Sequence, residues 1–291
     1  MDRVLPGWFS ETSDLWPGRA LSLEITQKLY STKSSFQAIE VYETRSCGRM
    51  LTLDGIIQFT ESDEFAYQEM LTHLPMFAHP DPRRVLVIGG GDGGILREVA
   101  RHATAEQIDL CEIDPAVIEV TKRFVPSMAR GFEDSRVSIH IADGAEFVRA
   151  RPAHYDVIIV DSTDPIGPAE SLFQEPFYAA MKSALRPAGI IATQAESFFL
   201  LAPIVQQLLG IARRLFEVWA YAYTLVPTYP GGHIGICLAS LGSELKRPAR
   251  RPDLELASQL RYYSPQIHEA AFVLPAFAER LIAETNLGQA E

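Results

Sequence analysis

The segment VLVIGGGDGG, residues 85–94, constrains the fold of this chain more than any other part of its sequence. Four apolar residues run directly into five glycines that one aspartate interrupts, and apolar residues then continue at helical spacing. This order of strand, glycine turn and helix predicts the nucleotide-binding start of a doubly wound α/β sheet. Glycine is needed because the backbone turns sharply and lies close to a ligand, which a Cβ atom would obstruct. The spacing of Gly89, Gly91 and Gly94 also satisfies the dinucleotide fingerprint, which is a weak signal by itself.

The aspartate in this turn, Asp92, distinguishes between two kinds of nucleotide ligand. In dinucleotide-binding folds a pyrophosphate lies at the helix N-terminus after the turn, where free N–H groups and the helix dipole favour an anion. Two like charges a few Å apart in a partly dry site repel each other by on the order of several kcal/mol. The turn therefore favours a nucleoside that carries positive charge, such as a sulfonium or an amine, over NAD. The side chain of Asp92 can also cap the following helix, and the two roles can coexist.

Strands and helices alternate after the glycine turn. Further strands are predicted over residues 108–112, 137–142, 155–160 and 189–193. Such alternation indicates a parallel sheet with helices on both faces. Three of the predicted strands end in an acid, namely Glu112, Asp143 and Asp161. Ligands of these sheets bind beyond the carboxyl ends of the strands, so we expect the three acids to share one ligand site.

A separate β region precedes this sheet. Apolar and polar residues alternate over residues 20–59, and Asp54-Gly55 between two apolar runs predicts a hairpin with a type I′ turn. The pattern predicts a small antiparallel domain over residues 1–62 and a catalytic α/β domain over residues 63–291. Thr60 and Ser62 are candidate N-caps for the helix that opens the second domain.

Charge and composition exclude several classes of partner. The net charge of −11 and the pI near 5.2 argue against nucleic acid and anionic membranes, and they suit a small cationic substrate. We expect no signal peptide, because the N-terminus lacks a basic start and an apolar run, and no apolar stretch approaches membrane-spanning length. The three cysteines include no CxxC pair, which favours the cytoplasm, and the seven histidines lack HxxxH spacing, so we expect no metal.

The acids at the strand ends suit the parts of a nucleoside. Glu112 lies about twenty residues past the glycine turn, where an acid accepts hydrogen bonds from a ribose diol. Asp143 with Gly144 suits the edge of an adenine, since the carboxylate accepts from the exocyclic amine and glycine leaves room for the ring. Each acid could instead be a solvated strand end, but their placement at successive strand ends favours a ligand.

The segment DSTDPIGPAES, residues 161–171, carries the most specific signal. Asp161 and Asp164 lie three residues apart, and a loop rich in proline and glycine follows that is long enough to close over a ligand. Paired carboxylates can hold a polyamine and accept a proton from it, and we expect their mutual repulsion to raise one pKa and improve that group as a base. The alternative is an Asx turn that only fixes the loop.

With these motifs the chain resembles the polyamine aminopropyltransferases over nearly its whole length, and within that family most closely the enzymes that use putrescine. The matching runs are QAIEV at 37–41, LDG at 53–55, DEFAYQEM at 63–70, GGGDGG at 89–94, CEID at 111–114, DG at 143–144, DSTDPIGPAESLF at 161–173 and PTYPGG at 227–232. The resemblance implies a class I methyltransferase-like Rossmann domain with a small N-terminal antiparallel β domain. It also implies that decarboxylated S-adenosylmethionine, a co-substrate rather than a tightly bound cofactor, donates an aminopropyl group to putrescine, leaving methylthioadenosine. Such proteins assemble as homodimers or homotetramers.

The resemblance also implies roles for individual residues. The donor would be bound by Gln37, Gln68, Asp92, Glu112, Asp143, Gly144 and Pro168. The diamine would be held by Tyr67, Asp92, Asp161, Asp164 and Tyr229. In these sets Asp92 would bind the propylamine of the donor, and Asp161 would accept the proton of the attacking amine. Apart from the resemblance, the place of Glu196 after the fifth predicted strand would let it either reach the far amine of the substrate or lie on the surface.

Three alternatives remain open from the sequence. The first is the same chemistry on agmatine, cadaverine or spermidine, because the length of the amine pocket is not visible. The second is an S-adenosylmethionine-dependent methyltransferase, which shares the glycine turn, although Asp92 and the pair of Asp161 and Asp164 favour cationic ligands. The third is a polyamine-binding module without activity, which would not need the donor site.

Overall fold

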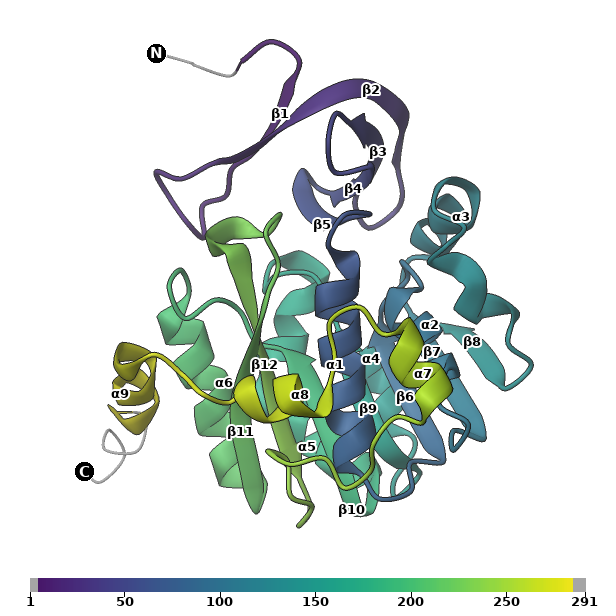
Figure 1. Cartoon of the computed structure of the whole chain (residues 1–291), viewed down its shortest axis with the longest axis vertical. Coiled ribbons are helices and arrows are strands. Elements are labelled where there is room, and N and C mark those ends of the chain that lie inside the picture. The colour runs from purple at the N-terminus through teal and green to yellow at the C-terminus, as the bar shows by residue number, and fades with distance from the viewer. Residues whose placement is uncertain (1–4, 285–291) are drawn as a thin grey trace.

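Figure 1 presents the computed structural model of the chain, which describes residues 5–284 and contains two β-sheets one above the other. The N-terminal sheet has five strands in chain order, each antiparallel to the next. Its strands are β1 (Trp8–Glu11), β2 (Leu21–Lys33), β3 (Ala38–Thr44), β4 (Arg49–Leu53) and β5 (Ile56–Thr60). Asp54 and Gly55, between β4 and β5, have φ values of 48° and 81°. Both are positive, as the predicted type I′ turn requires.

The second sheet has seven strands in the order β11-β12-β10-β9-β6-β7-β8. These are β6 (Arg84–Gly89), β7 (Gln107–Glu112), β8 (Val137–Ile141), β9 (Tyr155–Asp161), β10 (Leu185–Gln194), β11 (Val218–Leu225) and β12 (His233–Ser240). Strands β6 to β10 are parallel to one another as predicted, and β12 runs antiparallel between β10 and β11. The chain order reverses between β6 and β9, where Gly89 pairs with Asp161. A crevice opens beyond the strands at such a switch point.

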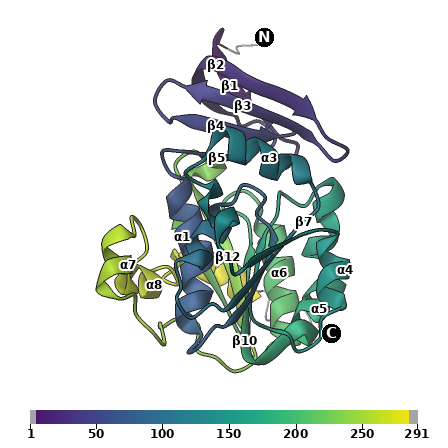
Figure 2. The ribbon, with the colours of Figure 1, turned by 90° about the vertical axis from the view of Figure 1, so that its right-hand side faces the viewer.

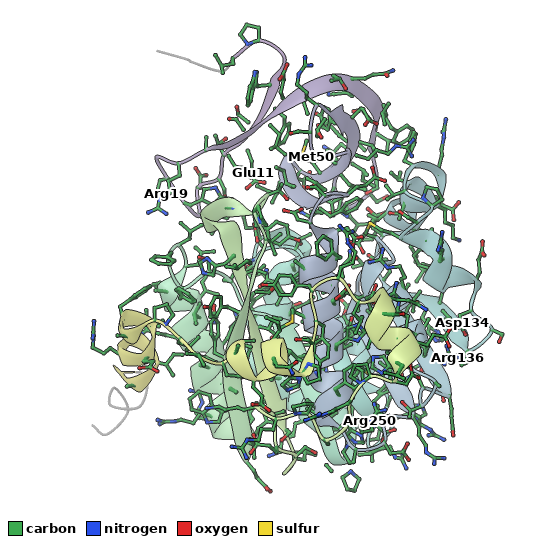
Figure 3. All side chains as sticks on the ribbon, viewed as in Figure 1. Glu11, Arg19, Met50, Asp134, Arg136 and Arg250 are labelled. Atoms are coloured by element: carbon green, nitrogen blue, oxygen red, sulfur yellow. The ribbon has the colours of Figure 1, made fainter. Side chains whose placement is uncertain are left out.

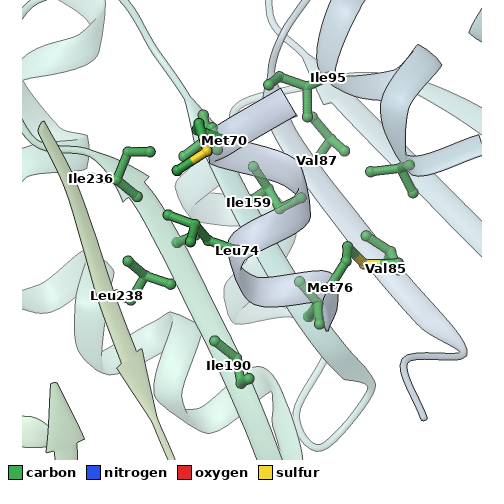
Figure 4. Close-up of a cluster of buried hydrophobic side chains, with 14 of the residues drawn as sticks. Met70, Leu74, Met76, Val85, Val87, Ile95, Ile159, Ile190, Ile236 and Leu238 are labelled. Carbon is green, nitrogen blue, oxygen red and sulfur yellow. The ribbon is translucent and has the colours of Figure 1, made fainter. Parts of the chain in front are cut away.

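Helices cover both faces of this sheet, as the alternating sequence pattern predicts. The α-helices of the described residues are α1 (Glu64–Ala78), α2 (Gly94–Ala100), α3 (Pro115–Phe124), α4 (Gly144–Arg149), α5 (Glu175–Ala184), α6 (Ala202–Leu215), α7 (Leu254–Gln259), α8 (Pro265–Ala270) and α9 (Ala276–Glu284). Val85 and Val87 of β6 pack in one buried cluster with α1 and α2, part of which Figure 4 shows. Leu86 and Ile88 pack in the opposite cluster with α4, α5 and α6. Both faces are buried, which explains the unbroken apolar run before the glycines.

The N-terminal sheet lies across the end of the α/β domain that holds α3 and the start of α1 (Figure 2). Ile39, Leu51 and Phe59 form a buried cluster with Val117 and Val120 of α3. Burial of side chains of this size stabilises the contact by about 1.5–3 kcal/mol each. The N-terminal sheet therefore covers the carboxyl ends of the parallel strands. Within residues 5–284 no helix is long and apolar enough to cross a membrane.

Candidate active site

A cavity of about 190 Å³ lies at the switch point, between the carboxyl ends of the parallel strands and the N-terminal sheet. The turn after β6 forms its floor. Gly89, Gly90 and Gly93 have φ values of 75°, 65° and 78°, which glycine adopts without strain. A Cβ at Gly89 would lie 2.1 Å from the carbonyl oxygen of Asp161, so β9 can approach β6 only because residue 89 is glycine.

Asp92 both lines this cavity and contacts the following helix. Its Oδ1 accepts a 2.9 Å hydrogen bond from the backbone N–H of Gly94, the first residue of α2. One conformation of this carboxylate therefore bonds the first N–H of α2 and also lines the cavity, which leaves the expected role toward a cationic ligand open to it. Burial raises the pKa of Asp92, whereas the N–H of Gly94 and the charge of Arg97 lower it.

Glu112 ends β7 and is almost fully buried beside the glycine turn. Its Oε2 accepts the N–H of Gly91 at 3.0 Å, and its Oε1 accepts the N–H of Asp114 at 2.8 Å. Burial raises its pKa to about 7, because the charged form is poorly solvated there. A carboxylate fixed on the cavity wall by two backbone N–H groups suits a ribose diol.

Asp143 and Gly144 lie beyond β8 on the same cavity wall. The Oδ1 of Asp143 accepts the N–H of Glu146 at 2.9 Å and so caps α4. A Cβ at Gly144 would lie 2.4 Å from Cγ2 of Ile88, so only glycine fits beside that side chain. The structure places this pair beside Glu112 at the rim of one cavity, as the successive strand ends predict.

Asp161 ends β9 and lines the same cavity as Glu112. The hydroxyl of Tyr67 donates a 2.7 Å hydrogen bond to its Oδ1. Burial raises the pKa of Asp161, the charge of Asp92 raises it further, and the hydrogen bond from Tyr67 lowers it. The sequence predicts that repulsion between Asp161 and Asp164 raises the pKa of one of them. For Asp161, burial and the charge of Asp92 are the principal causes of the raised pKa instead.

Asp164 belongs to a second group of acids, which sequence reasoning did not assemble. Its Oδ2 is buried without a hydrogen-bond partner, and its charge raises the pKa of both Glu11 and Glu196. Burial is the larger cause for both of these acids. The alternative that Glu196 is a surface residue is wrong, because it is 4% exposed and lines the cavity.

Glu11, at the end of β1, is the third member of this second group of acids. Trp16 lies nearby in the chain, in the loop that follows β1. Glu11, labelled in Figure 3 between the two sheets, is 0% exposed. Its Oε2 accepts the N–H of Ile57 at 2.6 Å, and its Oε1 has no partner. Trp16 lines the cavity, and its buried Nε1 also lacks a partner. Neither residue lies in a motif, so their role becomes visible only when the N-terminal sheet is placed over the cavity.

Of the remaining residues expected at the site, Tyr229 and Gln37 line the cavity and Gln68 does not. Tyr229 lines the cavity and its hydroxyl donates to the carbonyl of Gln58 at 2.6 Å. Gln37 lines the cavity and its Nε2 donates to Oδ2 of Asp114 at 3.1 Å. Gln68 is not among the cavity-lining residues and contacts Asp92 instead. The side chain of Pro168 lies outside what the structure describes.

The charge of the cavity wall is one-sided. Six carboxylates line it, Asp92, Glu112, Asp143, Asp161, Asp164 and Glu196. Among its described lining residues there is no lysine or arginine. Over residues 5–284 no group of three or more His, Cys, Asp or Glu side chains is placed to hold a metal ion. The arrangement suits a ligand with several positive charges.

Comparisons with known proteins agree with this geometry. The family model described as the spermine/spermidine synthase domain matches residues 64–247, and the model described as the spermidine synthase tetramerisation domain matches residues 7–61. Spermidine synthase of Dictyostelium discoideum is 50% identical over 280 residues, covering 96% of this chain and 99% of that protein. Spermidine synthase 2 of Datura stramonium is 51% identical over 288 residues, covering 96% and 91%.

Two solved structures share the fold. A crystal structure of spermidine synthase in complex with the transition state analogue AdoDATO superimposes with a TM-score of 0.89 at 36% identity, covering 97% of this chain and 96% of that chain. Spermidine synthase from Thermotoga maritima superimposes with a TM-score of 0.87 at 37% identity, covering 95% and 94%. Since both domain models match in order and the relatives span nearly the whole chain, this protein belongs to the spermidine and spermine synthase family and is an aminopropyltransferase.

Proposed function

We propose that this enzyme transfers the aminopropyl group of decarboxylated S-adenosylmethionine to putrescine, producing spermidine and methylthioadenosine. The observation that carries the proposal is a cavity lined by six carboxylates and, among the described residues, by no lysine or arginine. Both proposed reagents are cations, one a sulfonium with an amine and the other a diamine. Opposite charges a few Å apart in a partly dry cavity attract each other strongly, so this wall selects both reagents.

The donor occupies the side of the cavity nearest the glycine turn. We assign its ribose to Glu112, its adenine to Asp143 and Gly144, and its propylamine to Asp92. Gln37 contributes from the N-terminal side and Pro168 from the base pocket. The assignment is supported by the backbone hydrogen bonds that fix Glu112, and by the space that Gly144 leaves beside Ile88. Asp92 also repels the carboxylate of ordinary S-adenosylmethionine, an abundant competitor.

The diamine extends from Asp161 toward the second acid group. Tyr67 and Tyr229, whose rings lie 5.8 Å apart, hold its near end, and Asp164 with Glu196 faces its far amine. The unpartnered buried Oδ2 of Asp164, which lines the cavity, supports this placement. Buried acceptors are costly to leave unsatisfied, and an ammonium group supplies the missing donors.

Asp161 is the general base in the proposed reaction. A protonated amine has no lone pair, and removing its proton near pH 7 costs about 4 kcal/mol for an amine of ordinary pKa. Asp161 accepts this proton, the amine nitrogen attacks the carbon next to the sulfonium, and the carbon–sulfur bond breaks with its electrons passing to sulfur. Holding both reagents in line supplies much of the remaining acceleration.

We also propose the organisation in which this reaction takes place. The N-terminal β domain comprises residues 1–62 and the catalytic domain residues 63–291, a division supported by the match boundaries at residues 61 and 64. The match to a tetramerisation domain supports a homodimer or homotetramer. The free cysteines Cys47, Cys111 and Cys237 support a cytoplasmic location, where thiols stay reduced.

Mass spectrometry of products tests the proposal. The enzyme is given decarboxylated S-adenosylmethionine whose aminopropyl group carries ¹³C, with an equimolar mixture of putrescine, cadaverine, agmatine and spermidine. The label distinguishes newly formed spermidine from the spermidine that was added. We expect spermidine formed from putrescine as the main product, with one methylthioadenosine released for each transfer. A main product formed from another amine would show that this amine, and not putrescine, is the preferred acceptor. Methylated products from ordinary S-adenosylmethionine, with none from the decarboxylated donor, would overturn the proposal in favour of a methyltransferase.

A further inference from the structure

The carboxamide of Gln68 is enclosed behind Asp92, outside the cavity. Gln68 is 1% exposed, and a Cβ added to Gly94 would lie 1.9 Å from its carboxamide. Its Nε2 faces Oδ2 of Asp92 at 3.5 Å. A carboxamide has a donor end and an acceptor end of nearly the same shape, so its effect on Asp92 depends on which end faces the carboxylate. The group that binds the opposite end sets this orientation.

Arg97 of α2 binds that opposite end. Its Nη2 donates to Oε1 of Gln68 at 3.1 Å. The guanidinium carries donors and no acceptor, so only the oxygen of the carboxamide can face it. With that oxygen committed to Arg97, the NH₂ group of Gln68 points toward Asp92.

Arg97 is itself held by two further acids. Its Nη1 and Nη2 donate to the two oxygens of Glu64 at 3.1 and 2.8 Å, and its Nε donates to Oε1 of Glu98 at 2.8 Å. Its side chain is 13% exposed, so these contacts are largely shielded from water. A planar fork with several fixed donors can make all of these bonds at once, which the single ammonium of a lysine cannot.

We infer that Arg97 is a positioning residue of the donor site, which orients the Gln68 carboxamide so that its NH₂ group supports the charged form of Asp92. The inference rests on the proposed role of Asp92 toward the donor amine. Without Arg97 the carboxamide can turn its oxygen toward the carboxylate, an arrangement that favours protonated Asp92. A protonated Asp92 loses its attraction for an ammonium group.

The electrostatics of Asp92 agree with this route. Burial and the charge of Glu64 raise its pKa, and Arg97 and Gln68 both lower it. Arg97 therefore lowers the pKa of Asp92, whereas Glu64, to which Arg97 is hydrogen-bonded, raises it. Neither Arg97 nor Gln68 is among the residues that line the cavity, so both act on the donor through Asp92.

Calorimetry with two ligands separates positioning from a structural role. Decarboxylated S-adenosylmethionine carries the amine that Asp92 binds, and methylthioadenosine lacks it. We expect Arg97→Lys to weaken binding of the donor by on the order of tenfold, the effect of one hydrogen bond to a charged group, and to leave methylthioadenosine binding unchanged. In steady-state kinetics the KM for the donor rises while kcat at saturating donor is retained. Equal losses for both ligands would overturn the inference.

Arg101, the C-cap residue of α2, offers a matched control. Its Nη1 lies 3.2 Å from Oε2 of Glu98, the acid that also binds Arg97. Unlike Arg97, it makes no hydrogen bond to Gln68 among the described contacts. We expect Arg101→Lys to change the affinity for neither ligand. A selective loss of donor affinity in this variant would assign the effect to the charge network around Glu98 and overturn the route through Gln68.

A double-mutant cycle tests the route itself. In a Gln68→Met background, Arg97→Lys should cause no further loss of donor affinity, and an additional tenfold loss would overturn the inference. Should Arg97→Lys fail to fold, Gln68→Met alone must show the selective loss, and wild-type donor affinity in that variant would refute the inference.

Asp92→Asn separates this inference from the proposed function. Unchanged donor affinity in Asp92→Asn would contradict the proposed role of Asp92 in the donor site. If donor affinity falls in Asp92→Asn but not in Arg97→Lys, only the role of Arg97 is contradicted.

Discussion

The hydroxyl of Tyr67 donates a 2.7 Å hydrogen bond to Oδ1 of Asp161, joining α1 to the end of β9. A Cβ at Gly90 would lie 3.4 Å from the other oxygen, Oδ2, so the carboxylate is held between a tyrosine and the glycine turn. This contact fixes the orientation of the proposed base, and it stabilises the ionised form in surroundings that otherwise favour the neutral acid.

Replacement of the base tests its role directly. We expect Asp161→Asn to bind the decarboxylated donor as the wild type does and to lose at least about a hundredfold in kcat, because a positioned base contributes about 10²–10⁴-fold. Calorimetry of donor binding and single-turnover kinetics measure the two effects separately. Turnover near the wild-type rate would remove Asp161 from this role.

Tyr67→Phe tests the hydrogen bond to Asp161. Loss of the donated bond raises the pKa of Asp161 further, and a base must be ionised to act, so the acid limb of kcat/KM for putrescine moves to higher pH. The shift should be about one pH unit, since a hydrogen bond to a charged group contributes about 1.5–3 kcal/mol and water replaces part of it. Activity then recovers at high pH. A uniform loss at all pH values would show that Tyr67 acts only by holding the diamine.

Glu196→Gln tests the second acid group. The neutral amide keeps the size of the side chain and removes one charge facing the far amine, so we expect KM for putrescine to rise by on the order of tenfold with donor affinity retained. A parallel assay with propylamine, which has no far amine, provides the control, because the substitution should not affect its KM. A similar rise for both amines contradicts the placement of the diamine.

Glu112 makes stability depend on pH in the ligand-free enzyme. Its pKa is raised from 4.5 to about 7, so the folded state holds a proton that the unfolded state releases between these values. Stability from this group is therefore present below about pH 4.5 and is lost as the pH rises through 7.

The matched variant is Glu112→Gln, which cannot titrate. Relative to this variant, the wild type should lose about 2–3 kcal/mol of unfolding free energy between pH 5 and pH 8. Taking the difference removes the contribution of other titrating groups, including the histidines. Urea denaturation at the two pH values measures it, and parallel pH dependences for the two proteins contradict the raised pKa.

Gly89→Ala tests the close approach of β6 and β9. The new Cβ would lie 2.1 Å from the carbonyl oxygen of Asp161 at a residue with a φ of 75°, so we expect a loss of about 3 kcal/mol or more. Gly167→Ala is the control, because its φ of 59° is also positive but no atom lies within 4 Å of the added Cβ. That variant should lose only about 1 kcal/mol, and equal losses would show that backbone conformation alone matters.

Helix α1 shows where local reasoning failed. The sequence predicts Thr60 or Ser62 as its N-cap, but Asp63 occupies that position and makes no capping hydrogen bond with its side chain. Its carboxylate instead accepts from Thr60 and from the backbone and hydroxyl of Thr228. Capping requires that the side chain be free to accept from the helix N–H groups. Here Thr228, 165 residues away in sequence, donates to the carboxylate of Asp63 instead.

The sequence by itself determined the features that depend on neighbours along the chain. The period of apolar residues distinguishes strands from helices, positive φ requires glycine in the turn, and parallel strands bring Glu112, Asp143 and Asp161 to one edge. Only the tertiary structure decided which groups meet across the cavity. Tyr67 and Asp161 are 94 residues apart in sequence, and Glu11 joins the acid group only because the N-terminal sheet packs over the strand ends. Such contacts are set by how buried surfaces fit together in space, and spacing along the chain does not encode that fit.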